Sequence, residues 1–388
     1  MAALADKECA VEKLSGLAMQ LGDFQGASCS IAQPVEIGAF TLTGPWPATD
    51  PYQRQFHDDR SGLPTLQRRG AGQAVVKGLS LPLDKGFRSF VSRQEPRDPA
   101  QRDHLNHLLQ WIIKHPADFL QYKAQTDVVC WRGHLHTVMS TPYESAKFCT
   151  GWIICACRID GVIYLSHFDT ASKAADKEIV DEKQAHFIYW GYKFEQYMTH
   201  PADDKAAFEE PVNNFHGFHA VLKGQVGATG LLFGAEMDCL DPLKKDAPPP
   251  RCYVELKTAR RPDTQRQWQS HYNHKMCKIW AQSFVSGVPT VLIGYRDDAG
   301  NCVSTEEMPV ARISKLAKEY GNSWSGGICL NFLDGFLRLV KRSVTEDYRH
   351  AVYKFEWNPG WDRVTAEKWP AHSQWQFIPD WYLEKRPR

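Results

Sequence analysis

The stretch GLLFGAEMDCLD (230–241), together with CYVELKT (252–258), decides the fold that we expect for this chain of 388 residues. Both stretches carry apolar residues in patterns typical of β-strands. Side chains two apart on a strand project to one face, so Glu236 lies with Asp238 and Glu255 with Lys257. The polar, proline-rich segment between them suits a hairpin connection. If the two strands pair, three carboxylates and one amine converge on a small volume.

This set of side chains is suited to the hydrolysis of phosphodiesters. Mg²⁺ takes oxygen ligands, usually one or two carboxylates with waters and substrate phosphate. Two such ions, about 3.5–4 Å apart, can act on the attacking and leaving oxygens, and a neighbouring lysine can steady the developing charge. The alternative is that Glu-x-Lys marks a solvated strand edge. The apolar residues around both pairs favour a metal site, because acids clustered beside a core need metal or basic partners.

The composition predicts a globular protein without an extended basic surface. Hydrophobic residues make up 43% of the chain and the formal net charge is +1, so any nucleic-acid surface must be a local patch. The 11 cysteines form no Cys-x-x-Cys pair, which favours reduced thiols in an intracellular protein. No apolar run approaches about 18 residues, so we expect no membrane span. The start of the chain lacks the pattern of a secretion signal.

Periodicity predicts elements along most of the chain, in an order that implies an α+β or α/β fold with mixed sheets. We expect helices over 103–115, 181–199, 265–285 and 325–342. We expect further strands at 128–135, 151–159, 162–168, 290–296 and 355–359. The pattern over 6–21 is that of an amphipathic helix, and residues 34–100 read as loops with short strands. We expect a flexible N-terminal segment, 1–33, and a single catalytic domain, 34–388.

Two of the expected helices carry polar residues that could reach the acids. Glu195 falls on the apolar stripe of Ile188, Tyr192 and Met198, and it is either a fourth acid of the metal site or a rim glutamate reaching water. The helix over 265–285 has a stripe that we expect to be buried: Trp268, Tyr272, Met276, Trp280 and Phe284. Its other stripe is polar: His271, Lys275, Lys278 and Gln282.

The polar stripe and Arg132 are the candidates for contact with nucleic acid. Lysines beside the acids would neutralise phosphates along a single strand, and exposed aromatic rings could stack bases. The alternative is an ordinary solvated helix face. Arg132, between Trp131 and Gly133, could bind a phosphate through both guanidinium nitrogens, and the glycine would let backbone approach closely.

With these residues assembled, the chain resembles the DXO family of decapping exoribonucleases, and the acid-rich strands resemble the core of the PD-(D/E)XK nucleases. The resemblance runs from about residue 35 to 385. Its motifs, in order, are QRQFH (53–57), HLL (107–109), WRGHL (131–135), TPYE (141–144), GYKFEQYM (191–198), the Glu-x-Asp strand, CYVELKT, WAQSF (280–284), GVP (287–289) and WYLE (381–384).

The resemblance implies two mixed or antiparallel β-sheets flanked by helices, with a PD-(D/E)XK-like core and a deep active-site cleft. The implied metal ligands are Glu195, Glu236, Asp238, Glu255 and the carbonyl of Leu256. The implied catalytic set is Glu236, Asp238, Glu255, Lys257 and Gln282, the last two near the scissile phosphate. The implied substrate-binding residues are Arg54, Asp103, Trp131, Arg132, Gly133 and His219, together with Glu236, Lys257 and Gln282. Asp103 and His219 depart from the glutamate and cysteine of mammalian members.

The activity that the resemblance implies is hydrolysis at the 5′ ends of RNA, with two Mg²⁺ ions as cofactors and Mn²⁺ as an alternative. The implied substrates carry a triphosphate, an unmethylated cap or an NAD cap, and 5′–3′ exonuclease activity can follow. The implied role is mRNA quality control in the nucleus, with the cytoplasm as an alternative. A 5′–3′ exonuclease partner is a fungal trait of the family with no residue-level sign here. Two alternatives stay open, a scaffold paralogue without catalysis and a DNA nuclease of the same superfold.

Overall fold

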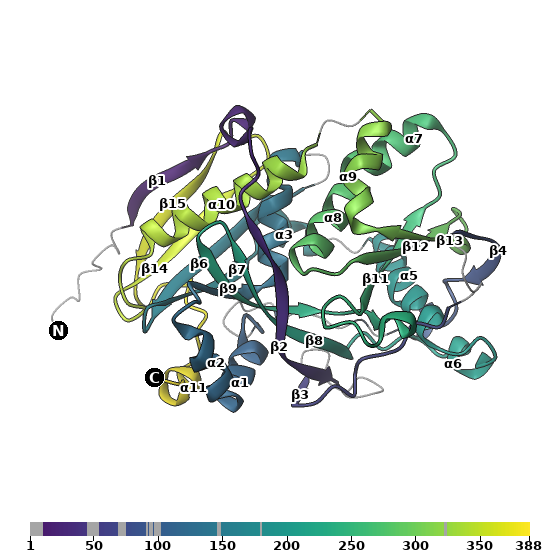
Figure 1. Ribbon diagram of the computed structural model, residues 1–388, viewed down its shortest axis with the longest axis horizontal. Coiled ribbons are helices and arrows are strands. Elements are labelled where there is room, and N and C mark those ends of the chain that lie inside the picture. Colours follow the sequence, from purple (N-terminus) through teal and green to yellow (C-terminus); the bar gives the residue numbers. More distant parts are fainter. Residues whose placement is uncertain are drawn as a thin grey trace, which may run out of the picture.

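The computed structural model contains two mixed β-sheets flanked by helices (Figure 1). It describes residues 11–44, 54–68, 75–90, 92, 96, 102–145, 149–178, 181–321 and 324–388. The larger sheet has ten strands in the order β1-β15-β14-β6-β7-β5-β9-β8-β2-β3, and the smaller has five in the order β10-β11-β12-β13-β4. The predicted fold class, with two mixed sheets and flanking helices, is confirmed.

The ten-stranded sheet is antiparallel except at its centre, where β5 runs parallel to both β7 and β9. Its strands, in chain order, are β1 (Glu12–Ala18), β2 (Ile31–Thr43), β3 (Gln55–His57), β5 (Val128–Trp131), β6 (Trp152–Ile159), β7 (Val162–Phe168), β8 (Gly217–Val226), β9 (Thr229–Glu236), β14 (Ala351–Trp357) and β15 (Arg363–Pro370).

The five-stranded sheet is antiparallel except for the pair β11 and β12. Its strands are β4 (Val75–Pro82), β10 (Cys239–Leu240), β11 (Tyr253–Arg260), β12 (Thr290–Arg296) and β13 (Asn301–Pro309). Strand β10 is so short that it pairs with β11 only at Val254 and Tyr253. The edge of β11 from Glu255 onward therefore has no strand partner on that side, and this open edge lies where the acids gather.

The helices cover both sheets. They are α1 (Asn106–Lys114), α2 (Pro116–Lys123), α3 (Arg132–Ser140), α4 (Ala171–Glu178), α5 (Glu182–Thr199), α6 (Lys205–Glu209), α7 (Gln265–Ser270), α8 (Met276–Val285), α9 (Val310–Glu319), α10 (Gly326–Ser343) and α11 (Asp380–Lys385). A π-helical turn, His271–Lys275, joins α7 to α8. Such turns are frequent at functional sites.

The expected hairpin forms only at Cys239 and Leu240, which pair antiparallel with Val254 and Tyr253 of β11, and the strand that carries Glu236 takes no part in it. Strand β9 pairs with β8 on one edge and with β5 on the other, so it has no free edge for β11. The chain leaves the large sheet after Glu236 and joins the small sheet at Cys239. Glu236 and Asp238 thus lie at the crossing between two sheets instead of on one strand.

Three other expectations differ from the structure. Within the expected helix over 6–21, residues 12–18 form β1, which pairs with β15, and 6–10 lie outside the described residues. The strand expected over 128–135 ends at Trp131, and α3 begins at Arg132 because Leu135, Val138 and Met139 supply a helical apolar stripe. The region 34–100, expected to hold loops with short strands, begins inside the 13-residue strand β2, which starts at Ile31 and ends at Thr43. The boundary expected at residue 33 falls inside that strand, and the division into segment and domain stays a prediction.

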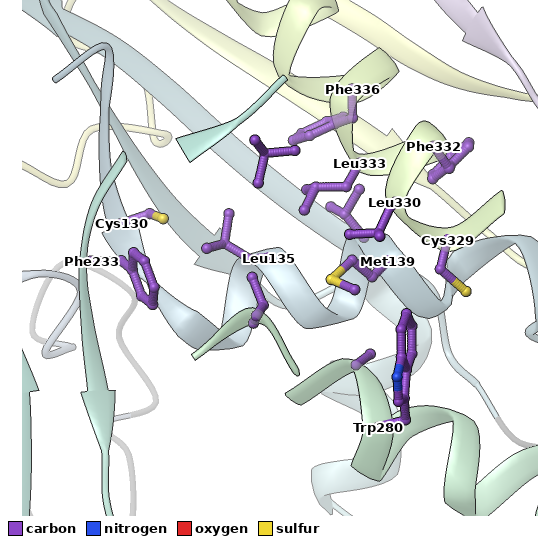
Figure 2. Packing of buried hydrophobic residues seen from close by; sticks show 14 of the residues in the cluster. Cys130, Leu135, Met139, Phe233, Trp280, Cys329, Leu330, Phe332, Leu333 and Phe336 are labelled. Carbon is purple, nitrogen blue, oxygen red and sulfur yellow. The ribbon is translucent and has the colours of Figure 1, made fainter. Parts of the chain in front are cut away.

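The remaining predicted helices and strands are observed, and α3, α8 and α10 pack around the largest core. Figure 2 shows Leu135 and Met139 of α3 facing Leu330, Leu333 and Phe336 of α10, with Trp280 of α8 beside them. All of these side chains are at least nine-tenths buried. Because α3 is held from both sides, the side chains in its first turn, including Arg132, have a fixed position.

Two further observations concern the chain as a whole. The ten cysteines that the structure describes are all free thiols, and eight of them are buried. Across the same described residues, no helix combines the length and the apolar character that a membrane span requires.

Candidate active site

The buried carboxylate of Glu255 is the centre of a polar cluster at the open edge of β11. Arg132 donates to its Oε2 at 2.9 Å, and Gln282 donates to its Oε1 at 2.5 Å. The Lys257 ammonium also contacts Oε1. Glu255 is 1% exposed, so these three donors replace water around its charge. The predicted convergence of Glu255, Lys257, Arg132 and Gln282 is observed.

Asp238 approaches the same cluster from the crossing between the sheets. Its Oδ2 accepts a hydrogen bond from the backbone N–H of Leu256 at 2.6 Å and lies 3.8 Å from the Lys257 Nζ. The N–H and C=O of one residue in a strand point to the same side. The Leu256 carbonyl therefore points from the open edge of β11 toward the acids, as its predicted role as a ligand requires.

Glu195 and Glu236 complete the group of four acids. Glu195 lies on α5, half-buried, and its carboxylate interacts electrostatically with Asp238, Glu236, Glu255 and Lys257. Its expected neighbour on the apolar stripe, Ile188, is instead exposed, while Met198 is buried. Glu236 ends β9 and is exposed toward a cavity. One carboxylate from each of α5, β9 and β11, and one from the crossing, thus lie near one another.

The pKa values in this group show a surplus of negative charge. Burial, followed by repulsion from Glu255, raises the pKa of Asp238 to about 7. Burial, followed by repulsion from Asp238, raises the pKa of Glu195 well above its usual range. Glu255 goes the other way: burial opposes its charge, but Arg132 and Lys257 outweigh burial and lower its pKa. At Asp238 and Glu195, burial and like charge thus outweigh the attraction of Lys257.

This donor set fits divalent cations in its chemistry. Among the described residues, no three His, Cys, Asp or Glu side chains already stand in a metal-binding arrangement. The Glu255 oxygens are engaged by Arg132, Lys257 and Gln282. All the candidate ligands are oxygens, the type that Mg²⁺, Mn²⁺ and Ca²⁺ prefer. A bound cation would also compensate the charge that raises the pKa of Asp238 and Glu195.

A cavity of about 560 Å³ adjoins the acids, and we name it the terminal pocket. The substrate-binding residues predicted from sequence line it together: Arg54, Asp103, Trp131, Arg132, Gly133, His219 and Glu236. Lys257, Gln282, Asp238 and Glu195 are not among its lining residues. The acids thus lie at one end of the pocket, with Arg132 and Glu236 shared between the two.

The walls of the terminal pocket are held by ring packing and ion pairs. Trp131 donates its indole N–H to the His104 carbonyl at 2.7 Å, and its ring packs edge-on against His219. His219 lies flat against Phe40, with ring centroids 5.2 Å apart. At the rim, the Arg54 Nη2 lies 3.5 Å from the Asp103 Oδ2. The imidazole at position 219 therefore extends an aromatic wall, while Arg54 and Asp103 form a polar rim.

Glycines provide the space for this site, and sequence reasoning missed two of them. A Cβ at Gly234 would lie 2.3 Å from the Trp131 ring, and one at Gly217 would lie 2.6 Å from the Glu236 Oε1. A Cβ at Gly133 would meet nothing within 4 Å, so the absence of a side chain there widens the pocket. The motif pattern singled out Gly133, but only coordinates reveal the close approaches at Gly217 and Gly234.

The match to protein-family models is the observation that decides the family. Residues 32–383 match the model described as RAI1 like PD-(D/E)XK nuclease. The chain belongs to this family of nucleases. Membership confirms the resemblance stated from the motifs, and it places the chain among enzymes named as decapping nucleases and exoribonucleases.

The relatives of this nuclease carry consistent names. The chain is 34% identical over 358 residues to the human decapping and exoribonuclease protein, covering 91% of this chain and 85% of the human one. It is 27% identical over 354 residues to the decapping nuclease RAI1 of Aspergillus fumigatus, covering 87% and 89% of the two chains. The crystal structure of Scheffersomyces stipitis Rai1 matches with a TM-score of 0.76 and 20% identity, covering 96% of this chain and 99% of that one. The structural match shows the fold.

Proposed function

We propose that this nuclease is a divalent-metal-dependent hydrolase that acts on the 5′ ends of RNA, removing an abnormal or incomplete 5′ group. The observation that carries the proposal is the group of four acids around Glu255, open to a pocket of nucleotide-compatible size. The names of the relatives support the same reaction, since they are called decapping nucleases and exoribonucleases.

The proposed metal ligands are Glu195, Glu236, Asp238, Glu255 and the Leu256 carbonyl. Divalent cations held there would supply Lewis-acid stabilisation of the negative charge that develops on phosphate oxygens. Structures of two relatives support this assignment: Scheffersomyces stipitis Rai1 is described with (3′-NADP)⁺ and calcium ion, and Candida albicans Rai1 with pU5-Mn²⁺. Among hard cations we propose two Mg²⁺ ions as the physiological pair, with Mn²⁺ as a substitute.

The other residues orient the substrate around these ligands. In the proposed reaction the Lys257 ammonium, held between Glu255 and Asp238, faces the charge on the scissile phosphate. The Gln282 amide, fixed by its bond to Glu255, donates to the same phosphate or orients the attacking water. Arg132 has a guanidinium that already holds Glu255, so it ties the position of that carboxylate to the pocket wall. Each of the three acts through hydrogen bonds and charge, without covalent chemistry.

The terminal pocket is the proposed site for the group at the RNA 5′ end. Trp131 and His219 offer ring faces for a base, and Arg54 offers a charge for phosphate. We propose triphosphate, unmethylated-cap and NAD-cap ends as substrates, with 5′–3′ degradation of the exposed chain to follow. A role in mRNA quality control in the nucleus, with the cytoplasm as the alternative, is proposed on the family resemblance alone. Association with a separate 5′–3′ exonuclease is also proposed on the family resemblance alone.

The test is product analysis with defined RNAs. Purified protein is incubated with triphosphate, NAD-capped, unmethylated-capped and monophosphate RNAs, in Mg²⁺ or in EDTA, beside single-stranded DNA of the same sequence. We expect release of the 5′ group from at least one capped or triphosphate RNA in Mg²⁺, and no release in EDTA. Cleavage of DNA alone, or of no substrate in Mg²⁺ or Mn²⁺, would contradict the proposal.

The matched variants are Asp238→Asn and Asp246→Asn. Asp238 bonds Leu256 N–H among the acids, whereas Asp246 is exposed on the loop after Leu240. We expect Asp238→Asn to lower kcat/KM by about 10²–10³-fold or more, because it removes a carboxylate that holds the cation facing the phosphate. Asp246→Asn leaves the rate unchanged. A rate within threefold of wild type for Asp238→Asn would refute its assignment.

A further inference from the structure

A second cavity, of about 700 Å³, lies beside the end of β11, where Thr258 and Arg260 line it, and we name it the basic groove. Its lining residues that matter here are Phe187 of α5, Arg260 of β11, Arg296 of β12, and His271, Lys275 and Lys278 of the long helical segment. The groove is separate from the terminal pocket, since the two have no lining residue in common.

Residues of the acid cluster or next to it line both cavities. Glu236 and Arg132 line the terminal pocket, whereas Thr258, directly after Lys257, lines the basic groove. Helix α8 connects the groove to the acids: Lys278 lies one turn before Gln282, which bonds Glu255. At about 1.5 Å per residue, Lys278 and Lys275 lie roughly 6 and 10 Å from Gln282 along the helix axis. Cations therefore recur along a line that starts at the reaction centre.

The charge of the groove favours an anion. Four cationic side chains line it, and Glu144 is its one carboxylate among the described lining residues. Glu144 already pairs with Lys278 at 2.8 Å, and Arg260 pairs with Asp298 outside the groove. The Lys275 ammonium contacts only the Thr258 carbonyl in the hydrogen bonds observed, and Arg296 lies against ring faces instead of a carboxylate. Lys275 and Arg296 are thus the cations with charge to offer.

The groove also offers a ring for stacking, and two of its lining residues have a buried polar atom without a hydrogen-bond partner. Phe187 is 41% exposed, and the Arg296 guanidinium lies 4.6 Å from its ring centroid. His271 is 8% exposed, and its buried Nε2 has no hydrogen-bond partner among the described residues. The Oδ1 of Asn273, also in the groove lining, is buried and unpartnered in the same way. An exposed ring beside cations is the combination that binds single-stranded nucleic acid.

We propose that the basic groove holds the RNA chain downstream of the cleaved bond, while the terminal pocket holds the 5′ group. The inference rests on the proposed function and adds the path of the polymer to it. Phosphates lie along Lys275 and Arg296, and a base stacks on Phe187 beside Arg296. The groove thereby makes a long RNA a better substrate than the 5′ group with one nucleotide.

The test compares chain lengths in groove variants and matched controls. The groove variants are Lys275→Gln and Phe187→Ala. Their controls are Lys315→Gln, an exposed lysine on α9, and Trp361→Ala, an aromatic residue that is also 41% exposed but lies elsewhere. Affinity for a 3′-labelled 20-nucleotide RNA is measured by fluorescence anisotropy in Ca²⁺ at several salt concentrations. Hydrolysis is measured as kcat/KM for the same RNA and for a dinucleotide, each carrying the same 5′ group.

We expect each groove variant to weaken binding of the 20-mer by about fivefold or more. Lys275→Gln also reduces the slope of log affinity against log salt by about 0.7, one phosphate contact on a single strand. The ratio of kcat/KM for the 20-mer to that for the dinucleotide falls by a similar factor, and both controls keep the wild-type values.

Unchanged binding and an unchanged length ratio in both groove variants would overturn the inference while leaving the proposed hydrolysis intact. An equal loss on the long and short substrates would also overturn it, because the groove residues would then support the acids and not the chain. If wild-type protein hydrolyses neither substrate, the proposed function fails, and the anisotropy measurement still decides whether the groove binds RNA.

Discussion

At the scale of single residues, the site depends on side chains and on the space left for them. Glu255 is buried and ionised because Arg132, Lys257 and Gln282 surround it. Removing Glu255 would leave buried cations without a partner, which is why Asp238, at the edge of the cluster, is the better residue for a catalytic test. The glycines contribute through the absence of a side chain, since any side chain at Gly234 would occupy the volume of the Trp131 ring.

Two glycine substitutions separate the stability of the site from its binding capacity. Gly234→Ala forces a Cβ to within 2.3 Å of Trp131, so we expect a loss of about 1–3 kcal/mol in the free energy of unfolding, measured in urea. Gly133→Ala has open space for its Cβ, so stability changes by less than about 0.5 kcal/mol while KM for the RNA rises as the pocket narrows. Equal stability of the two variants would contradict the packing described here.

Buried histidines make stability depend on pH. Burial, followed by the neighbouring His167, lowers the pKa of His134 well below its usual range. Burial, followed by the neighbouring Lys275, lowers the pKa of His271 to about 4. An unfolded histidine titrates near about 6.5. Between these values the unfolded chain binds more protons than the folded one, so stability is full above about pH 6.5 and falls as the pH falls toward 4.

The expected slope is up to about 1.4 kcal/mol per pH unit for each such histidine. Urea unfolding in EDTA at pH 7.5, 6.5 and 5.5 measures it. His271→Gln should have a shallower slope than wild type by roughly that amount below pH 6.5. A slope below pH 6.5 that is the same in His271→Gln as in wild type would show that this imidazole is not buried in neutral form.

At the scale of elements, the local sequence pattern predicted the helices and strands of the site better than it predicted which strands pair. Periodicity located α5, α8 and β11, and spacing placed Glu255 and Lys257 on one face. Spacing could not reveal that β9 has both edges occupied by β8 and β5, so that the chain leaves the large sheet after Glu236 and joins a second sheet at Cys239. Hydrogen-bond pairing between strands distant in sequence is decided by the whole fold, and a single stretch does not encode it.

Other elements were missed because their patterns are short or mixed. The run after Trp131 continues an apolar strand in the sequence, yet the spacing of Leu135, Val138 and Met139 against α10 makes it a helix. Strand β1 has an alternating burial pattern over only part of its length, and its partner β15 lies more than 340 residues away. The site residues themselves could be predicted because their motifs recur in a known family. The close contacts at Gly217 and Gly234 could not be predicted from those motifs.

Strand β1 is expected to stabilise the fold without serving the site. It ends the ten-stranded sheet six strands from β9, roughly 29 Å at the usual strand spacing, and Figure 1 shows it at the far side from β11. A protein lacking residues 1–18 loses the packing of Leu14 and Leu17 and exposes β15. We expect unfolding to cost about 1–3 kcal/mol less, with kcat/KM within twofold of wild type. A large loss of activity in the folded truncated protein would contradict the expectation that β1 stabilises the fold without serving the site.

At the scale of the whole molecule, two sheets and a crossing chain bring acids together beside two cavities. Neither sheet alone holds the four carboxylates: Glu236 ends a strand of the large sheet, Glu255 lies in the small one, and Glu195 comes from α5. The net charge of +1 is consistent with a local basic surface, and four cationic side chains line the basic groove.

The central claim is that these converging carboxylates bind divalent cations, and calorimetric titration of the full-length protein with Mn²⁺ tests it most directly. We predict saturable binding to wild type and to Asp246→Asn, weakened at least about tenfold in Asp238→Asn. Equal Mn²⁺ affinity in wild type and Asp238→Asn, or no binding to wild type at millimolar Mn²⁺, would contradict the claim.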